Sequence, residues 1–133
     1  MRWAMRILLV EDDRRFGQVL KLELERDRHV VDLSSDGVEG VLSFMETPCA
    51  LILIDIRMPR LGGIDALRII RKLDPKVPAI VFSAVAGANE IVEAELAGAV
   101  KFLSKPFEFA VLKDEIAKLS IPAAPPGGTG KAG

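Results

Sequence analysis

Side chains that can do chemistry follow short hydrophobic runs at four places in this sequence. These runs, each with the polar residues that come after it, are 6–10 with Glu11 and Asp12, 51–54 with Asp55, 77–82 with Ser83, and 99–103 with Lys105. A carboxylate at the end of a buried segment is costly unless a partner compensates its charge. Asp55, which comes directly after Leu-Ile-Leu-Ile, therefore needs positive charge close to it.

If these runs are neighbouring strands, three carboxylates, a hydroxyl and an ammonium converge. Several carboxylates repel one another unless a cation joins them, and Mg²⁺ binds one or two carboxylates together with water and substrate phosphate. Mg²⁺ and Lys105 would neutralise a transferring phosphoryl group, and Ser83 would donate a hydrogen bond to it. One carboxylate must then act as a general base or as a nucleophile. Since no other good base is near, we interpret Asp55 as a nucleophile that forms an aspartyl phosphate.

The elements that must position these residues alternate along the chain. We expect strands over residues 6–10, 29–33, 50–54, 77–82 and 99–103, and helices over residues 13–27, 38–45, 64–73, 91–96 and 107–119. Short buried strands that alternate with amphipathic helices predict an α/β fold, a doubly wound five-stranded parallel sheet of the flavodoxin-like (βα)₅ type. A strand order of 2-1-3-4-5 would bring the polar residues to one edge, where open α/β sheets bind their ligands.

Composition limits the possible functions. The chain has 133 residues, of which 50% are hydrophobic and 28% charged, with a formal net charge of −1. There is no basic excess that would favour direct nucleic-acid binding by this domain. No signal peptide is apparent, and no apolar stretch reaches the ~18 residues that span a bilayer. The single Cys49 cannot form an internal disulfide, and we expect a cytoplasmic protein without a membrane partner.

Local signals complete the organisation of the chain. Asp13 and Asp36 are expected to cap helices, and His29 to lie at the surface where a strand begins. The final "PPGGTGKAG" is not a phosphate-binding P-loop, because Pro125 and Ala132 stand where that motif needs Gly and Ser or Thr. We predict one domain over residues 1–120, followed by a flexible Pro/Ala/Gly tail or linker over residues 121–133.

The segments "ILLVEDD", "LILIDIRMPRLGG", "VFSA" and "GAVKFLSKPF", in this order, resemble the receiver domain of two-component response regulators. The resemblance covers about residues 6–120. It implies that Asp55 is the phosphoacceptor. It also implies a Mg²⁺ or Mn²⁺ site in which Asp12 binds the metal directly, Glu11 acts through water, and Arg57 contributes its backbone carbonyl, with Asp55 as a further ligand.

The same resemblance assigns roles on the neighbouring strands. Ser83 matches the hydroxyl residue that contacts the phosphoryl group, and Lys105 matches the lysine that pairs with it and precedes a cis proline. Phe102 matches an aromatic switch residue that turns inward on phosphorylation. The regulated surface would comprise the helix over residues 91–96, the strand over 99–103 and the helix over 107–119.

Three positions depart from the common pattern of that family. Phe102 is often Tyr, so no hydroxyl is available there for a partner. Ser83 stands in place of Thr, which keeps the hydroxyl and loses a methyl group. Gly62 replaces an acid that is common just before the glycine of the third helix, so the preceding loop is expected to be more mobile. None of these changes removes a group that phosphorylation requires.

The resemblance predicts a signalling switch that accepts a phosphoryl group from a histidine kinase or a phosphotransfer protein. It would regulate a downstream protein or output domain, and catalyse only its own phosphorylation and dephosphorylation. We expect a monomer or a weak phosphorylation-dependent dimer. One alternative is an aspartyl-phosphate phosphohydrolase, which needs a second acid where this chain has Arg57. Another is a degenerate receiver that acts only as a binding module.

Overall fold

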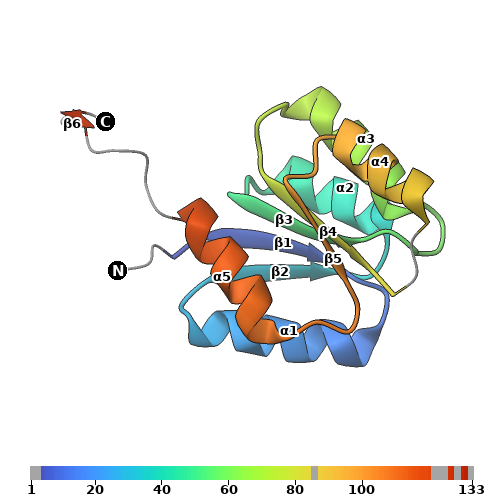
Figure 1. The fold of residues 1–133 in the computed structure, drawn as a ribbon, viewed down its shortest axis with the longest axis horizontal. Coiled ribbons are helices and arrows are strands. Elements are labelled where there is room, and N and C mark those ends of the chain that lie inside the picture. Colours follow the sequence, from blue (N-terminus) through green and yellow to red (C-terminus); the bar gives the residue numbers. More distant parts are fainter. Residues whose placement is uncertain (1–3, 85–86, 121–125, 128–129, 132–133) are drawn as a thin grey trace.

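Five parallel strands form a single sheet, flanked by five helices (Figure 1). The computed structural model describes residues 4–84, 87–120, 126–127 and 130–131. The strands are β1 (Arg6–Val10), β2 (Val30–Ser34), β3 (Leu51–Asp55), β4 (Ala79–Ser83) and β5 (Lys101–Ser104). The helices are α1 (Arg14–Arg26), α2 (Gly37–Glu46), α3 (Gly63–Leu73), α4 (Ala88–Leu96) and α5 (Phe109–Ser120). The strand order is β2-β1-β3-β4-β5, which confirms the predicted flavodoxin-like topology.

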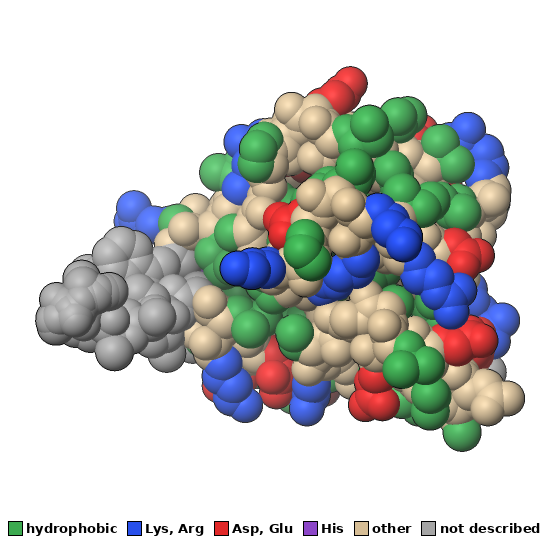
Figure 2. All heavy atoms as spheres, turned by 90° about the horizontal axis from the view of Figure 1, so that it is seen from above, with side chains coloured by type: hydrophobic (Ala, Val, Ile, Leu, Met, Phe, Trp, Pro, Cys, Tyr) green, Lys and Arg blue, Asp and Glu red, His purple; other side chains and the backbone are tan. Residues whose placement is uncertain are grey.

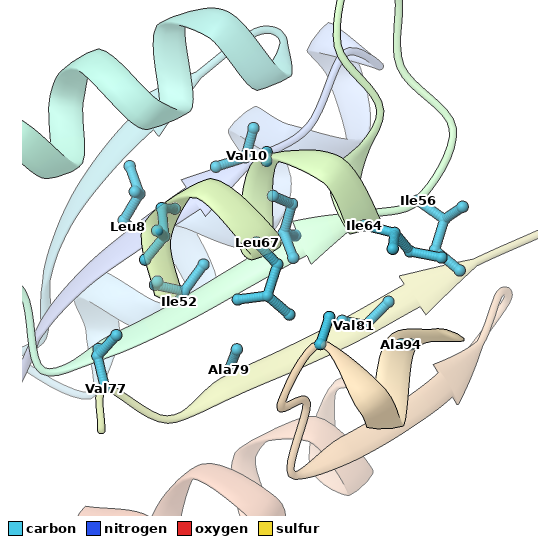
Figure 3. Packing of buried hydrophobic residues seen from close by; sticks show 14 residues of the cluster. Leu8, Val10, Ile52, Ile56, Ile64, Leu67, Val77, Ala79, Val81 and Ala94 are labelled. Carbon is cyan, nitrogen blue, oxygen red and sulfur yellow. The ribbon is translucent and has the colours of Figure 1, made fainter. Parts of the chain in front are cut away.

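The core has two halves because successive side chains of a strand point to opposite faces of the sheet. On one face, Leu8, Ile52 and Val81 pack against the buried residues of α3 and α4 (Figure 3). On the other face, Leu9 and Leu53 pack against α1 and α5. Figure 1 shows the same division, with α1 and α5 on one side of the sheet and α2, α3 and α4 on the other. The central strand β3 is buried along its whole length, so its last residue, Asp55, has a fixed position.

Arg71 on α3 ties the end of α4 to the start of β4. Its guanidinium donates to the backbone carbonyls of Ala97 (3.2 Å), Gly98 (2.8 Å), Val77 (2.5 Å) and Asp74 (3.3 Å). Gly98 follows the end of α4 and has a φ of +96°, a conformation that favours glycine. Burial lowers the pKa of the Arg71 guanidinium, and its carbonyl partners compensate for the lost water.

Two local expectations are confirmed and one is wrong. The side chains of Asp13 and Asp36 accept from the backbone N–H groups of Phe16 (3.1 Å) and Glu39 (2.9 Å), and so cap α1 and α2. His29 was expected at the surface, but only 6% of it is exposed. It precedes β2, and its Nδ1 accepts from the Met5 backbone N–H at 3.0 Å, a contact between distant residues that has no local sequence signal.

Four element starts also differ from prediction by two residues or more. α4 begins at Ala88 rather than at residue 91, and the other three elements begin later than expected. Proline has no N–H to give to the ladder, so β4 begins at Ala79, directly after Pro78. β5 begins at Lys101 because the Ala99 N–H bonds instead to Ala94 of α4. α5 begins at Phe109 rather than at residue 107.

The C-terminal segment contains a short antiparallel pair, β6 (Pro126–Gly127) with β7 (Gly130–Lys131). The other residues of the expected tail, 121–125, 128–129 and 132–133, lie outside the described residues. The domain boundary at residue 120 and the flexibility of the tail therefore stay predictions. Across the face shown in Figure 2, acidic, basic and hydrophobic side chains are interspersed. Among the described residues, no helix has the length and apolar character needed to span a membrane.

Candidate functional site

The polar residues predicted from the sequence lie at the carboxyl edge of the sheet. Asp55 is the last residue of β3 and Ser83 the last residue of β4, while Glu11 directly follows β1. Asp55 pairs with Phe82, and Ser83 pairs with Ser104 in the parallel ladder. Lys105 then comes immediately after β5. The strand order brings together residues that are up to 94 positions apart in the chain.

The Lys105 ammonium forms the centre of this cluster. Its Nζ lies 2.6 Å from Asp55 Oδ2 and 2.6 Å from Glu11 Oε1. The Lys105 backbone N–H donates to the Ser83 carbonyl at 2.8 Å, and the Lys105–Pro106 peptide bond is cis, as expected. Burial acts to lower the pKa of Lys105, but its hydrogen bonds to Asp55 and Glu11 outweigh that effect, and the pKa is raised. Lys105 therefore stays charged between the two acids.

The Glu11 carboxylate is almost fully buried, with 2% of the residue exposed. Its Oε2 accepts from the Asp13 backbone N–H at 3.1 Å, while Oε1 accepts from Lys105. Burial raises the pKa of Glu11 to about 7, even though both hydrogen bonds act to lower it. Burial thus disfavours the charged form of Glu11, and a cation at the site would compensate for this effect.

The Asp55 carboxylate is held at both oxygens. Oδ1 accepts from the Arg57 backbone N–H at 2.9 Å, and Oδ2 accepts from Lys105. Only 5% of Asp55 is exposed, because β3 is central and Gly63 packs directly against its backbone. The carboxylate is therefore oriented before any ligand arrives.

Three carboxylates are close enough to share a cation. One oxygen each from Glu11, Asp12 and Asp55 can be chosen so that all lie within 4.8 Å of one another. Asp12 is exposed and the other two are buried. Such an all-oxygen set with one side open to water fits a hard divalent ion such as Mg²⁺, which keeps several waters in its shell. These residues therefore suit the metal expected from the sequence.

Two further predicted residues lie on the neighbouring strands β4 and β5. Ser83 is 1% exposed at the end of β4. Phe102 lies on β5, where it pairs with Val81 and is partly buried against the core on the α3 and α4 side of the sheet. Their suggested roles as phosphoryl contact and switch stay predictions.

The Arg57 side chain connects the site to α4, which the sequence did not predict. Its Nη2 lies 2.8 Å from Glu90 Oε1. Glu90 also accepts from the Gly87 backbone N–H at 3.1 Å at the start of α4. Arg57 thus joins the loop after Asp55 to the first turn of α4. Position 57 therefore carries a cation, whereas the phosphohydrolase alternative needs an acid there.

Phe16 is a second residue near the site that sequence analysis missed. It lies on α1, and the Lys105 ammonium is 4.5 Å from the centre of its ring. In the sequence, Phe16 is one of several apolar residues on a helix, and helical periodicity predicts only that such a residue faces the core. Its proximity to Lys105 depends on how α1 packs beside the segment that follows β5.

Comparison with known proteins identifies the family. Residues 7–117 match the model of the response regulator receiver domain. The transcriptional regulatory protein YkoG of Bacillus subtilis is 36% identical over 106 residues, which cover 80% of this chain and 46% of that protein. The chain spans about half the length of the curated relatives that it matches.

Solved structures agree with this assignment. The non-phosphorylated receiver domain of HemR from Leptospira biflexa is 31% identical, with a TM-score of 0.82 over 90% of this chain and 97% of that one. The response regulator TrrA of Thermotoga maritima, solved in complex with Mg²⁺ and BeF, is 29% identical, with a TM-score of 0.78 over 86% of this chain and 97% of that one. The sheet order, the residues at its carboxyl edge and these matches together show that the chain belongs to the receiver domain family of two-component response regulators.

Proposed function

We propose that this domain is a phosphorylation-controlled switch whose phosphoacceptor is Asp55. The observation that carries the proposal is the position of Lys105 Nζ, 2.6 Å from an oxygen of Asp55 and 2.6 Å from an oxygen of Glu11. An oriented carboxylate with an ammonium beside it can attack phosphorus while the positive charge stabilises the phosphoryl oxygens.

In the proposed reaction, an Asp55 oxygen forms a bond to the phosphorus of a phosphohistidine, and the bond between phosphorus and the imidazole nitrogen breaks. The Arg57 backbone N–H holds the other Asp55 oxygen at 2.9 Å, and so fixes the direction of attack. Lys105 then pairs with the phosphoryl group, and Ser83 donates its hydroxyl hydrogen to it. When bound by Glu11, Asp12, Asp55 and the Arg57 carbonyl, Mg²⁺ supplies positive charge to the phosphoryl oxygens. The complex of the Thermotoga regulator with Mg²⁺ supports this ligand.

The proposed output follows from the same family. Phosphorylation draws Ser83 toward the phosphoryl group, and Phe102 turns inward on β5. This changes the surface formed by α4, β5 and α5, which a downstream protein or output domain reads. The related YkoG is a transcriptional regulatory protein, so we propose transcriptional control as the output of the whole protein. We propose a histidine kinase as the phosphodonor, and a cytoplasmic location.

The direct test is phosphorylation by acetyl phosphate in the presence of Mg²⁺, followed by intact mass measurement. We expect one added phosphoryl group on the wild-type protein and none on the Asp55→Asn variant. Asp13→Asn is a matched control, because Asn can still cap α1 and Asp13 lies next to the carboxylate cluster without belonging to it. This variant should be phosphorylated normally. A wild-type protein without an adduct would indicate a degenerate receiver, and rapid release of phosphate from many small esters would indicate a phosphohydrolase.

A further inference from the structure

The Lys105 ammonium lies over aromatic rings as well as between carboxylates. Its Nζ is 4.5 Å from the centre of the Phe16 ring and 5.4 Å from the centre of the Phe82 ring. Both distances are within the range of about 6 Å at which an ammonium is attracted by the face of a ring. Because the Lys105 side chain is mostly buried, at 17% exposure, water screens this attraction only weakly.

The Phe16 ring is itself held by other rings. Phe82 and Phe107 meet it edge to face, with centroids 6.1 Å and 5.8 Å away, and the Phe109 centroid lies 6.5 Å away. Phe82 also meets Phe107 edge to face at 5.7 Å. These rings come from α1, β4, the segment after β5 and the first residue of α5. The contacts therefore connect the start of α1 to Phe107, which follows Lys105–Pro106. These ring contacts restrain the position of the Phe16 side chain.

The two carboxylates and the ring act on Lys105 from different elements. Glu11 follows β1 and Asp55 ends β3, whereas Phe16 belongs to α1. Two carboxylates alone leave the ammonium on a long flexible stem, free to shift toward either acid. A ring face adds attraction without adding a formal charge, so it restrains the ammonium and leaves its charge available to a third group.

We propose that Phe16 is a positioning residue that keeps the Lys105 ammonium in place for the phosphoryl group, acting through a cation–π contact. This inference rests on the proposed function and deepens it, since it assigns a residue of α1 to the phosphorylation site. An aliphatic residue of similar size fills the space but has no negative ring face. The electronic character of the ring, beyond its volume, then sets the rate of phosphorylation.

The test replaces Phe16 with phenylalanines that carry one, two or three fluorine atoms on the ring, and also with leucine. Fluorination weakens the negative face of the ring and nearly preserves its shape. With acetyl phosphate and saturating Mg²⁺, we expect the rate of Asp55 phosphorylation to fall stepwise with fluorine number. For Phe16→Leu we expect a rate about threefold to tenfold lower, the size of a partly desolvated cation–π contact. Phe109→Leu is the control: it changes the same ring cluster, but the rings near the Lys105 ammonium are those of Phe16 and Phe82, and Phe82 and Phe107 still hold Phe16 edge to face. We expect its rate to stay near that of the wild type.

A second measurement reads the contact without phosphorylation or metal. The ring current of Phe16 should shift the Lys105 ε-methylene protons upfield in the NMR spectrum, and this shift should disappear in Phe16→Leu but persist in Phe109→Leu. A rate that is independent of fluorine number, or a Lys105 resonance unaffected by Phe16→Leu, would overturn the proposal. If the wild-type protein takes up no phosphoryl group, the proposed function fails, and the NMR comparison still decides whether Phe16 holds the ammonium.

Discussion

At the residue scale, the position of Asp55 depends on Gly63, which has no Cβ. Gly63 begins α3, and its N–H donates to the Ile56 carbonyl at 2.8 Å. A Cβ at Gly63 would collide with the backbone carbonyl of Asp55. Gly62 differs, since a Cβ there would meet only the Ile56 carbonyl oxygen, at 3.1 Å. With a φ of −70°, its backbone also suits any residue.

We therefore predict that Gly63→Ala displaces Asp55 and lowers the free energy of unfolding by roughly 1–3 kcal/mol, as overpacking of a close contact does. Phosphorylation by acetyl phosphate should slow as well, because Asp55 and Lys105 move apart. Chemical denaturation and intact mass measure the two effects. Gly62→Ala is the matched control and should change stability by less than about 1 kcal/mol. Equal behaviour of the two variants would contradict this account.

At the element scale, α2 and the loop after β3 are joined through one carboxylate. Asp36 Oδ1 caps α2, and its Oδ2 lies 2.7 Å from Arg60 Nη2 in that loop. The backbone N–H of Glu39, and next the Arg60 side chain, lower the pKa of Asp36 below its ordinary value. The Asp36 carboxylate thus binds a proton less readily in the folded state than in the unfolded state. The stability that Asp36 contributes is present above its ordinary pKa and is lost as the pH falls through its folded-state pKa.

We predict that Asp36→Ala lowers the Tm at neutral pH and that the difference from the wild type shrinks as the pH falls below about 4. Asp36→Asn keeps an acceptor for the Glu39 N–H but loses the charge, so it should retain the cap and lose the pairing with Arg60. Thermal unfolding over a pH series measures both. A difference between wild type and Asp36→Ala that does not vary with pH would rule out the charge as its source.

At the scale of the whole molecule, the fold gathers three acids at one edge against their mutual repulsion. The carboxyl ends of β1 and β3 bring Glu11, Asp12 and Asp55 within reach of one ion, and Lys105 compensates part of the charge. A ligand that binds only the folded protein stabilises it in proportion to the logarithm of its concentration. The proposed metal site therefore predicts a link between Mg²⁺ and unfolding of the whole domain.

We predict that Mg²⁺ raises the Tm of the wild-type protein. At ten times its dissociation constant, Mg²⁺ should add about 1.4 kcal/mol to the free energy of unfolding. Asp12→Asn should abolish most of this rise, and because Asp12 is exposed, its substitution leaves the core intact. Calorimetry with and without Mg²⁺, at equal ionic strength, measures the effect. A wild-type Tm that does not change with Mg²⁺, or an equal rise in the Tm of Asp12→Asn, would refute the proposed metal site.

Much of the architecture was predictable because its causes are local. Runs such as Leu51-Ile52-Leu53-Ile54 are hydrophobic at every position, which predicts a strand buried on both faces. Asp13 and Asp36 cap the helices that follow them, because an N-cap contact spans only three residues. The convergence of the polar residues after the strands, Asp55 among them, was predicted from a general rule of the fold: parallel strands present their carboxyl ends at one edge of the sheet.

Other features were decided only by the tertiary structure. The contact of Lys105 with Glu11 joins residues 94 positions apart, and Phe16 reaches Lys105 only because α1 packs beside the segment after β5. The surface position predicted for His29 was wrong because its partner is the backbone N–H of Met5, 24 positions earlier. The kinds of element and the polar residues that follow the strands could be inferred from the sequence alone, since they depend on periodicity and on local signals. Only the packing of the elements decided which side chains touch, since such contacts depend on geometry between distant segments.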